Sequence, residues 1–524
     1  RRSSDLGKFG GYDYGDVLQS INPGDIESIS VLKGPSASAL YGSSASNGVV
    51  MITTKSAAAG QRIGVELSSS VSMVSLLSHF QDYQRVYGQG RDGQLPMDIN
   101  DANGIQYAWG AKLDPTAMAY VFTGDYVDYG NKSDNVLSFF KTGVTLNNSV
   151  AISKSTGTGS FRLSLSDMRL DDIMPKSGMT KTSVMMKASQ RFGKKLTLDA
   201  QATYTVETTD NRPALGGLGN NVIHSLINLA PSLDQAWLAD HYKDKDGNYI
   251  RTGSSSSTVY NPYWVINEMK NESERDRLVG KVSMTWKIRK DLTFYAKGGL
   301  DTFKRDISEL TPISTPSYEN GRIVQKHTDM TQTDFEARLT YAKKFGKLDV
   351  NSFVGANVRH HLNKTTNLEG LNHLLTDVID ITGFETRQVS RTVSEKEVRS
   401  LYGQLSLGWN DIYYLDATVR NDVSSSLAPK HRSYWYPSLS GSILASNMFE
   451  HGKWLTFAKL RGSWARVGGD TSPYQLSLDY ALRDFTLNGK SLGTATGMSS
   501  IPYYDLKPTS TNSIEFGADL RFFD

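Results

Sequence analysis

The chain has 524 residues, no cysteine and a formal net charge of +3 at pH 7. The lack of cysteine excludes a disulfide framework and thiolate chemistry, and the small net charge gives no support to a nucleic-acid-binding surface. Hydrophobic residues make up 38% of the chain, yet no run approaches the ~18 consecutive apolar residues of a membrane helix.

The first notable segment along the chain is residues 10–16, which read GGYDYGD. Large polar ligands are commonly held by aromatic rings and hydrogen-bonding groups on loops. We therefore take Tyr12, Asp13 and Tyr14 as candidate substrate-binding residues. An ordinary glycine-rich loop has the same composition, so the sequence leaves both interpretations open.

Residues 22–55 combine a short helical signal with two strands. Pro23 stands near the start of the helical piece, where a missing N–H costs least. A short strand is predicted at residues 29–32, and a second, apolar strand is predicted at residues 49–54.

Tight turns join these two strands. Gly42, Asn47 and Gly48 mark the turns, because glycine and asparagine accept backbone conformations that other residues avoid. We expect at least one of the two glycines to have a positive φ.

From residue 62 onward, apolar and polar residues alternate with a period of two, which is typical of strands with one apolar and one polar face. The clearest examples are residues 62–74, 161–166, 196–207, 292–297, 413–420 and 514–522. These strands are roughly ten residues long, the length that crosses a bilayer when the strand is tilted.

The polar faces of these strands carry charged residues. In a barrel such side chains would line the lumen and hold an internal domain through ion pairs and hydrogen bonds, whereas in a soluble sheet they would face solvent. The predicted lumen-facing residues are Arg162, Asp199, Glu207, Lys297, Asp301, Asp416, Arg420, Glu515 and Arg521.

A soluble β-sandwich also has alternating strands. Tyrosine and tryptophan, however, gather at predicted strand ends, at residues 263–264, 413–414, 434–436 and 503–504. Aromatic girdles of this kind are expected where a membrane barrel meets the lipid–water interfaces. The pattern therefore favours a membrane barrel over a sandwich.

The sequence of residues 39–55, which contains ALYG followed by NGVVMITTK, closely resembles the end of the plug domain of TonB-dependent outer-membrane transporters. Later blocks resemble the SusC/RagA branch of that family, among them NPYW, KLRGSWARVGG and DLKPTSTNSIEFGADLRFF. Val423 and Leu427 depart from the usual pattern of the branch and leave the substrate class open.

This resemblance implies an all-β fold, a transmembrane antiparallel β-barrel of about 22 strands when complete. It also implies the C-terminal part of an α/β plug at residues 1–55, a linker at residues 56–60 and a partial barrel at residues 61–524. Open sheet edges are not tolerated in lipid, so we expect the natural protein to continue past Asp524 and most of the plug to precede Arg1.

The resemblance further implies TonB-dependent import of a glycan or oligopeptide across the outer membrane of a Gram-negative bacterium. The implied partners are a SusD-like surface lipoprotein that forms a lid, the TonB–ExbB–ExbD system and outer-membrane lipid. Two alternatives stay open: a siderophore or cobalamin receptor, and a SusC-like barrel that serves as a non-transporting structural subunit of an outer-membrane assembly.

Three motifs suggest other chemistry only superficially. Residues 88–93 spell GxGxxG, but Pro96 follows and no helix pattern does, so a loop is expected. Residues 244–248 resemble a calcium loop without its glycine or closing glutamate. His360 and His361 would point to opposite faces of a strand. We therefore predict no enzyme, no metal and no cofactor.

Overall fold

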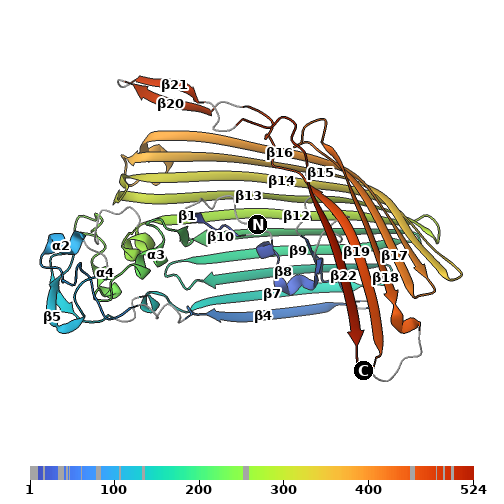
Figure 1. The fold of residues 1–524 in the computed structure, drawn as a ribbon, viewed down its shortest axis with the longest axis horizontal. Coiled ribbons are helices and arrows are strands. Elements are labelled where there is room, and N and C mark those ends of the chain that lie inside the picture. Colours follow the sequence, from blue (N-terminus) through green and yellow to red (C-terminus); the bar gives the residue numbers. More distant parts are fainter. Residues whose placement is uncertain are drawn as a thin grey trace.

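A computed structural model gives the arrangement of the chain (Figure 1). The described residues are 10–15, 18–32, 41–42, 45, 48–58, 60, 62–77, 84–104, 108–132, 136–251, 259–448, 455–478, 481–487, 490–496 and 501–523. The predicted turn residue Asn47 lies outside them.

One curved antiparallel sheet of 14 strands dominates the described part of the chain (Figure 1). Its strands are, in order across the sheet, β4 (Gly64–Val74), β7 (Gly143–Ser155), β8 (Gly159–Asp171), β9 (Gly178–Phe192), β10 (Leu196–Asp210), β12 (Lys270–Lys287), β13 (Leu292–Thr315), β14 (Tyr318–Phe345), β15 (Leu348–His373), β16 (Phe384–Trp409), β17 (Tyr413–Ser424), β18 (Ser433–Leu444), β19 (Phe457–Gly469) and β22 (Thr509–Arg521). Neighbours in the sheet follow one another along the chain, as in an up-and-down barrel wall. The predicted all-β class is confirmed, with β4 and β22 at the two edges of an open part of a barrel.

The two ends of the sheet differ in their connections. At one end the turns are short, for example residues 156–158 and 346–347. At the other end, the long segments 75–142 and 211–269 carry small elements (Figure 1). These elements are α2 (Ile99–Gly104), β5 (Asp114–Tyr120), β6 (Tyr126–Tyr129), η5 (Leu137–Phe139), β11 (Ala214–Gly216), α3 (Val222–Ile227), α4 (Gln235–Asp240) and α5 (Pro262–Asn267). Four further elements lie in later connections: η6 (Ile381–Gly383), η7 (Ala445–Asn447), and β20 (Ala481–Leu487) and β21 (Lys490–Thr496), which pair as a hairpin.

The N-terminal segment forms β1 (Gly10–Tyr12), η1 (Leu18–Ser20), η2 (Pro23–Asp25), β2 (Ile26–Leu32) and β3 (Val49–Thr54). β2 pairs with β3, and β1 pairs with β11 in one of the long connections. The predicted helical piece is only a single 3-10 turn, because the ladder with β3 begins at Ile26 and draws the backbone into a strand.

Burial on the sheet is the reverse of that in a soluble sandwich. On β8 the polar residues Arg162 and Ser164 are 5% and 1% exposed, while the apolar residues Phe161, Leu163 and Leu165 are 39–48% exposed. A sandwich packs its apolar faces together and leaves its polar faces in water. This sheet instead presents its apolar face outward, which suits lipid and excludes the sandwich.

The outward apolar face forms a belt of limited height. On β14 it runs from Phe335 to Phe345, both about half exposed. Ten residues of a strand span roughly 34 Å, or about 25 Å of height at the usual tilt, which is the height of the lipid-facing band of membrane barrels. The strands β13–β16 have 24–28 residues, so they extend well past this belt. No helix among the described residues is long and apolar enough to cross a membrane.

The prediction of an aromatic girdle is confirmed only in part. Tyr413 and Trp435 are exposed on the outward face, as expected. Tyr434 and Tyr436 are buried, because alternation along β18 turns the neighbours of Trp435 inward. Trp264 is also buried, since it belongs to α5 and not to a strand end.

Adjacent residues of β16 test the assignment of faces. Leu405 is 43% exposed in the outward belt, and Gln404 points inward, where it bonds Ser406. We expect Leu405→Arg to destabilise the folded barrel by about 2–4 kcal/mol and Gln404→Arg to cost much less, since an arginine at the lipid midplane must be desolvated. Folding titrations of the full-length protein in lipid vesicles measure both values, and equal losses would contradict the assignment.

Candidate functional site

The N-terminal segment is held against the inward face of the sheet by polar side chains at several separate places. Each contact joins a turn of the segment to charged residues of the wall. Together these contacts form the candidate functional site, because they hold the segment against the inward face of the wall.

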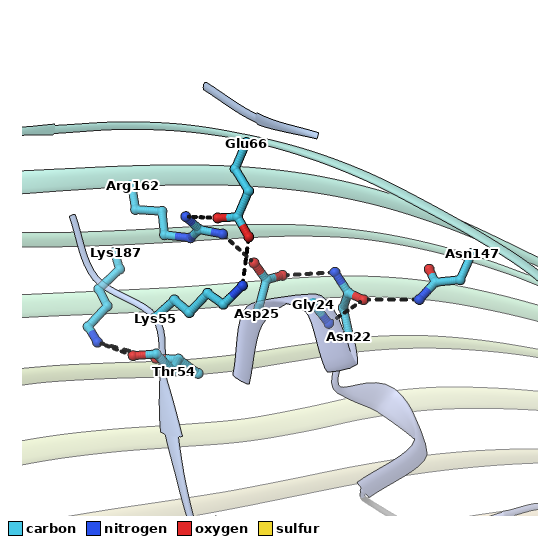
Figure 2. A network of polar contacts seen from close by, with 9 residues as sticks. All are labelled: Asn22, Gly24, Asp25, Thr54, Lys55, Glu66, Asn147, Arg162 and Lys187. Atoms are coloured by element: carbon cyan, nitrogen blue, oxygen red, sulfur yellow. Dashed lines mark hydrogen bonds and ion pairs between the residues drawn. The ribbon is translucent and has the colours of Figure 1, made fainter. Parts of the chain in front are cut away.

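The first contact is centred on Asp25, at the end of η2 (Figure 2). Arg162 of β8 reaches Asp25 at 3.4 Å and Glu66 of β4 at 3.0 Å. Lys55, just after β3, completes the cluster with a 2.6 Å ion pair to Glu66. The side chains of Asp25 and Arg162 are 7% and 5% exposed, so this pair is largely removed from water.

The local sequence holds the turn in position for this contact. Asn22 caps η2 by accepting from the backbone N–H of Gly24 at 3.1 Å, and its amide donates to Asp25 at 3.2 Å (Figure 2). Asn147 of β7 donates to the same cap oxygen at 3.4 Å. Lys187 of β9 donates to the carbonyl oxygen of Thr54 at 2.8 Å, which fixes the end of β3.

The second contact grips Ser20, at the end of η1. Arg275 and Arg277 of β12 both donate to the Ser20 hydroxyl, at 3.3 and 2.9 Å. Each arginine has an acidic partner on a neighbouring strand: Glu207 at 2.8 Å for Arg275, and Asp301 at 2.7 Å for Arg277. A neutral hydroxyl therefore bridges two ion pairs, of which the Arg275–Glu207 pair is buried and the Arg277–Asp301 pair is partly buried.

A cavity lies between these first two contacts. It has a volume of about 220 Å³ and is lined by residues of both the N-terminal segment and the wall, including Asn22, Thr54, Gln201 and Thr203, although most of its lining surface is apolar. The cavity is much larger than the roughly 10–15 Å³ that one water molecule needs. The segment is thus bound at points and does not pack continuously against the wall.

The third contact is a close approach of backbone to an ion pair. Gly42 has a φ of +77°, and a Cβ atom built there would lie 2.8 Å from Asp422 and 2.9 Å from Arg420. These two residues of β17 bond each other at 2.7 Å, and Arg420 also donates to Ser400 at 2.7 Å. Gly48 has a φ of +99°, so the expectation of positive φ is confirmed at both glycines.

The segment Tyr12–Tyr14 lies at the end of the sheet with the long connections. Tyr14 is 3% exposed and donates to Glu309 at 3.0 Å, while it accepts from Asn271 at 3.1 Å. The guanidinium of Arg305 lies 4.9 Å from the centre of its ring. Burial, followed by the charge of Glu309, raises the pKa of Tyr14 well above its usual value, so the phenol stays neutral.

Tyr12 and Asp13 are more accessible than Tyr14. Tyr12 accepts from Asn220 at 3.0 Å, and its pKa is raised mainly by burial. The backbone oxygen of Asp13 accepts from Arg212 at 2.8 Å, and its carboxylate is exposed and bonds Gly15. The role of these residues in substrate binding stays a prediction.

The predicted lumen-facing residues have different neighbours. Arg162, Glu207, Asp301 and Arg420 meet the N-terminal segment directly or through a partner, as described above. Lys297 pairs with Asp334 and Glu336 within the sheet.

The other predicted positions lie outside these contacts. Asp416 bonds Ser406 of the adjacent strand, and Asp199 is half-buried on β10. Glu515 and Arg521 are exposed on the edge strand β22. For all of these residues a lumenal role stays a prediction.

Sequence reasoning missed Arg275, Arg277 and Lys181. The start of β12 reads KNESERDR, in which every residue is polar, so no apolar alternation marks its inward face. Lys181 precedes the apolar part of β9, yet it donates to the carbonyl oxygen of Gln19 at 2.6 Å. Alternation counted back from Ser283 would have assigned both arginines to the inward face.

No metal centre emerges from the part of the chain that the structure describes, where no three His, Cys, Asp or Glu residues are arranged to hold an ion. His360 instead bonds Glu395 at 2.8 Å on the outer face of the sheet. The arrangement offers ion pairs and hydrogen bonds for holding a segment in place.

Comparisons with known proteins agree with this arrangement. The family model of the TonB-dependent receptor plug domain matches residues 3–49. Over 96% of its length the chain is 22% identical to TonB-dependent receptor P3 of Formosa agariphila. Over 86% of its length it is 25% identical to TonB-dependent receptor SusC of Bacteroides thetaiotaomicron.

Solved structures show the same fold. The chain superposes on the RagAB peptide importer in its closed-closed state with a TM-score of 0.76 and 20% identity, over 98% of this chain and 59% of that one. The siderophore receptor PirA from Acinetobacter baumannii superposes less closely, with a TM-score of 0.52 and 14% identity over 97% and 57% of the two chains.

The fold and the site define a barrel wall with a segment held inside it, and the chain is similar in both sequence and fold to TonB-dependent receptors. Within that class the chain is similar to transporters of the SusC/RagA branch along most of its length, which confirms the resemblance inferred from its motifs. The chain spans about half the length of the curated relatives, 48% of P3 and 44% of SusC.

A double-mutant cycle tests the first contact. Arg162→Leu leaves the buried carboxylate of Asp25 without its cation, and such a loss typically costs roughly 3–5 kcal/mol. We expect the full-length protein with this change to show leak currents in planar bilayers, and Arg162→Leu with Asp25→Leu to be tighter than the single variant.

Arg169→Leu is the matched control, because Arg169 lies on the same strand but is 72% exposed in its pair with Asp167. Exposed pairs contribute at most about 1 kcal/mol, so this variant should conduct like the wild type. Equal currents from Arg162→Leu and Arg169→Leu would show that the buried pair does not hold the segment.

Alanine substitutions at two glycines distinguish the effect of backbone strain from the effect of a steric clash. Gly42 and Gly60 have nearly equal φ values of +77° and +76°, but a Cβ at Gly60 meets nothing within 4 Å. Replacing either by alanine adds strain of roughly 1–2 kcal/mol. Only Gly42→Ala also pushes against Arg420 and Asp422, so we expect leak currents for this variant alone. Equal behaviour of the two would mean that the third contact does not seal the interior.

Proposed function

We propose that the complete protein is a TonB-dependent importer of the SusC/RagA type in the outer membrane of a Gram-negative bacterium. The observation that carries this proposal is the pairing of an exposed apolar outer face with an inner face whose charged residues hold a separate segment. A passive pore would gain nothing from such a segment inside its wall. A releasable segment, in contrast, is what a gated importer requires.

The proposed domain division follows the described elements. Residues 1–55 form the C-terminal part of the plug, which ends just after β3 at Thr54. Residues 56–60 are a linker, and the barrel at residues 61–524 begins with β4 at Gly64. Membrane barrels have short periplasmic turns and longer external loops, so we place the long connections on the cell surface.

Polar contacts make this plug firm but releasable. A buried ion pair contributes little net stability compared with apolar packing, because desolvation offsets most of the attraction. When TonB, driven by ExbB and ExbD, pulls on the plug, water can replace the lost hydrogen-bond partners one contact at a time. The wall itself remains folded, because its ladders run between its own strands.

The cargo in this proposal is a glycan or oligopeptide too large for a simple pore. A SusD-like surface lipoprotein would close over the long connections and trap the cargo above Tyr12 and Asp13. No covalent step is needed, since binding and a mechanical opening perform the whole process. RagAB, which the fold resembles, is a peptide importer, and SusC is a TonB-dependent receptor.

Uptake in cells tests the function. We expect a strain that carries the full-length gene to take up its cargo from mixed oligosaccharides or peptides, and to lose this uptake when the TonB gene is deleted or the gene itself is removed. The TonB-deleted strain should still carry the folded barrel in its outer membrane, as gel mobility before and after boiling would show. Undiminished uptake without TonB would refute active import.

A further inference from the structure

A small pocket lies beside Tyr12, where β1 meets the long connection between β10 and β12. It has a volume of about 40 Å³, which has room for roughly three water-sized groups. Asn220, Arg212 and Asn271 contribute its polar wall. The pocket therefore joins the N-terminal segment, an external connection and the start of a wall strand.

The polar wall of this pocket is incompletely bonded. Among the described residues, the Oδ1 atoms of Asn220 and Asn271 and the Nε–H of Arg212 are buried without a hydrogen-bond partner. Asn271 is only 3% exposed. Buried polar atoms without partners are rare in native proteins because each costs about 1–3 kcal/mol. Three of them on one pocket indicate a place built for a ligand.

The network around Tyr14 fixes which atom of Asn271 faces the pocket. Tyr14 donates its only proton to Glu309, so its oxygen must accept from the Nδ2 group of Asn271. The carbonyl oxygen of the same amide is then turned away from Tyr14 and left as an acceptor. The Nδ2 group of Asn220 likewise donates to Tyr12, which leaves the Oδ1 atom of Asn220 as a second acceptor.

The pocket lining contains two cations. The two terminal nitrogens of Arg212 donate to neutral partners, the backbone oxygen of Asp13 at 2.8 Å and the hydroxyl of Thr209 at 2.9 Å. Lys270 also lines the pocket, with an exposed side chain. Both tyrosines stay neutral at physiological pH, because burial raises the pKa of each phenol. The atoms left free are two neutral acceptors and one N–H donor. An anionic ligand group can only accept, so it would leave both asparagine oxygens unpaired, and a cationic group would meet Arg212 and Lys270.

We propose that this pocket is a subsite for the hydroxylated edge of a neutral sugar residue. A single hydroxyl group can accept from Arg212 and donate to an asparagine oxygen at once, whereas in a peptide the donor N–H and the acceptor C=O are separate groups that point in opposite directions. Two or three adjacent hydroxyls match both the free atoms and the volume of about 40 Å³. The apolar side of the pocket, formed by Met174, Val222, Ile266 and Met269, can face the C–H groups of the ring.

This subsite deepens the proposed function, because it rests on import and narrows the cargo to a glycan. A bound sugar would also strengthen the short contact between β1 and β11. β1 and β11 pair over only three residues, so their ladder alone is a weak tie between plug and loop. A sugar bound to Asn220 and Asn271 would bridge the external connection and the wall directly beside that ladder.

Binding to the full-length protein in detergent tests the subsite. The probes are an array of neutral oligosaccharides and, in parallel, a library of short peptides. We expect an oligosaccharide to bind and its affinity to fall about tenfold or more in Asn271→Leu and in Asn220→Leu, because each change removes one acceptor and keeps a similar volume. Asn220→Leu provides an independent reading if Asn271→Leu folds poorly.

Asn228→Leu is the matched control. Asn228 is an exposed residue at the end of α3 whose amide bonds His224, outside this pocket. Its replacement should leave oligosaccharide affinity unchanged. Gel mobility before and after boiling confirms that each variant has a folded barrel.

The other outcomes separate the subsite from the proposed function. Oligosaccharide binding that is equally strong in the wild type and both pocket variants would overturn the subsite. Binding of peptides alone, with TonB-dependent uptake intact, would overturn the sugar assignment and leave import standing. Binding of neither class, together with no TonB-dependent uptake, would overturn both proposals.

Discussion

The inverted burial of the sheet is the constraint on which the rest of the structure depends. Lipid accepts only apolar side chains, so the polar side chains of each strand must turn inward. There they lose most of their water, and residues such as Arg162 and Arg277 need partners that the wall alone supplies only in part. The N-terminal segment provides the missing groups at Ser20 and Asp25. The plug is therefore held by the same rule that makes the wall fit the membrane.

That rule also determines how firmly the segment is held. An apolar interface would have to be exposed to water all at once when the segment moves, and each 100 Å² of it would resist by about 2.5 kcal/mol. The observed contacts are ion pairs and hydrogen bonds separated by a cavity of about 220 Å³. Water can replace such partners singly. Retention at rest and release under force are then compatible in one interface.

The sequence predicted the features that depend on local pattern. Period-two alternation identified the strands, and glycines 42 and 48 were recognised as turn positions with positive φ. Prediction from the sequence failed for features that depend on residues far apart in the chain. Tyr434 and Tyr436 were placed in a girdle from composition alone, although alternation with Trp435 buries them. Partners such as Ser20 and Arg277 lie 257 positions apart, and no periodicity reports that distance.

Two places in the first part of the N-terminal segment differ in a way that alternation could never have shown. At Ser20 both arginines have acidic partners, so the contact is completed by the protein itself. At Tyr12 and Tyr14, Asn220 and Asn271 each donate to a tyrosine, and among the described residues the amide oxygen of each has no partner. Tyr14 meets the start of β12 at Asn271, and Ser20 meets the same strand further along, at Arg277. In the proposed function, this difference separates the recognition of cargo from the retention of the segment.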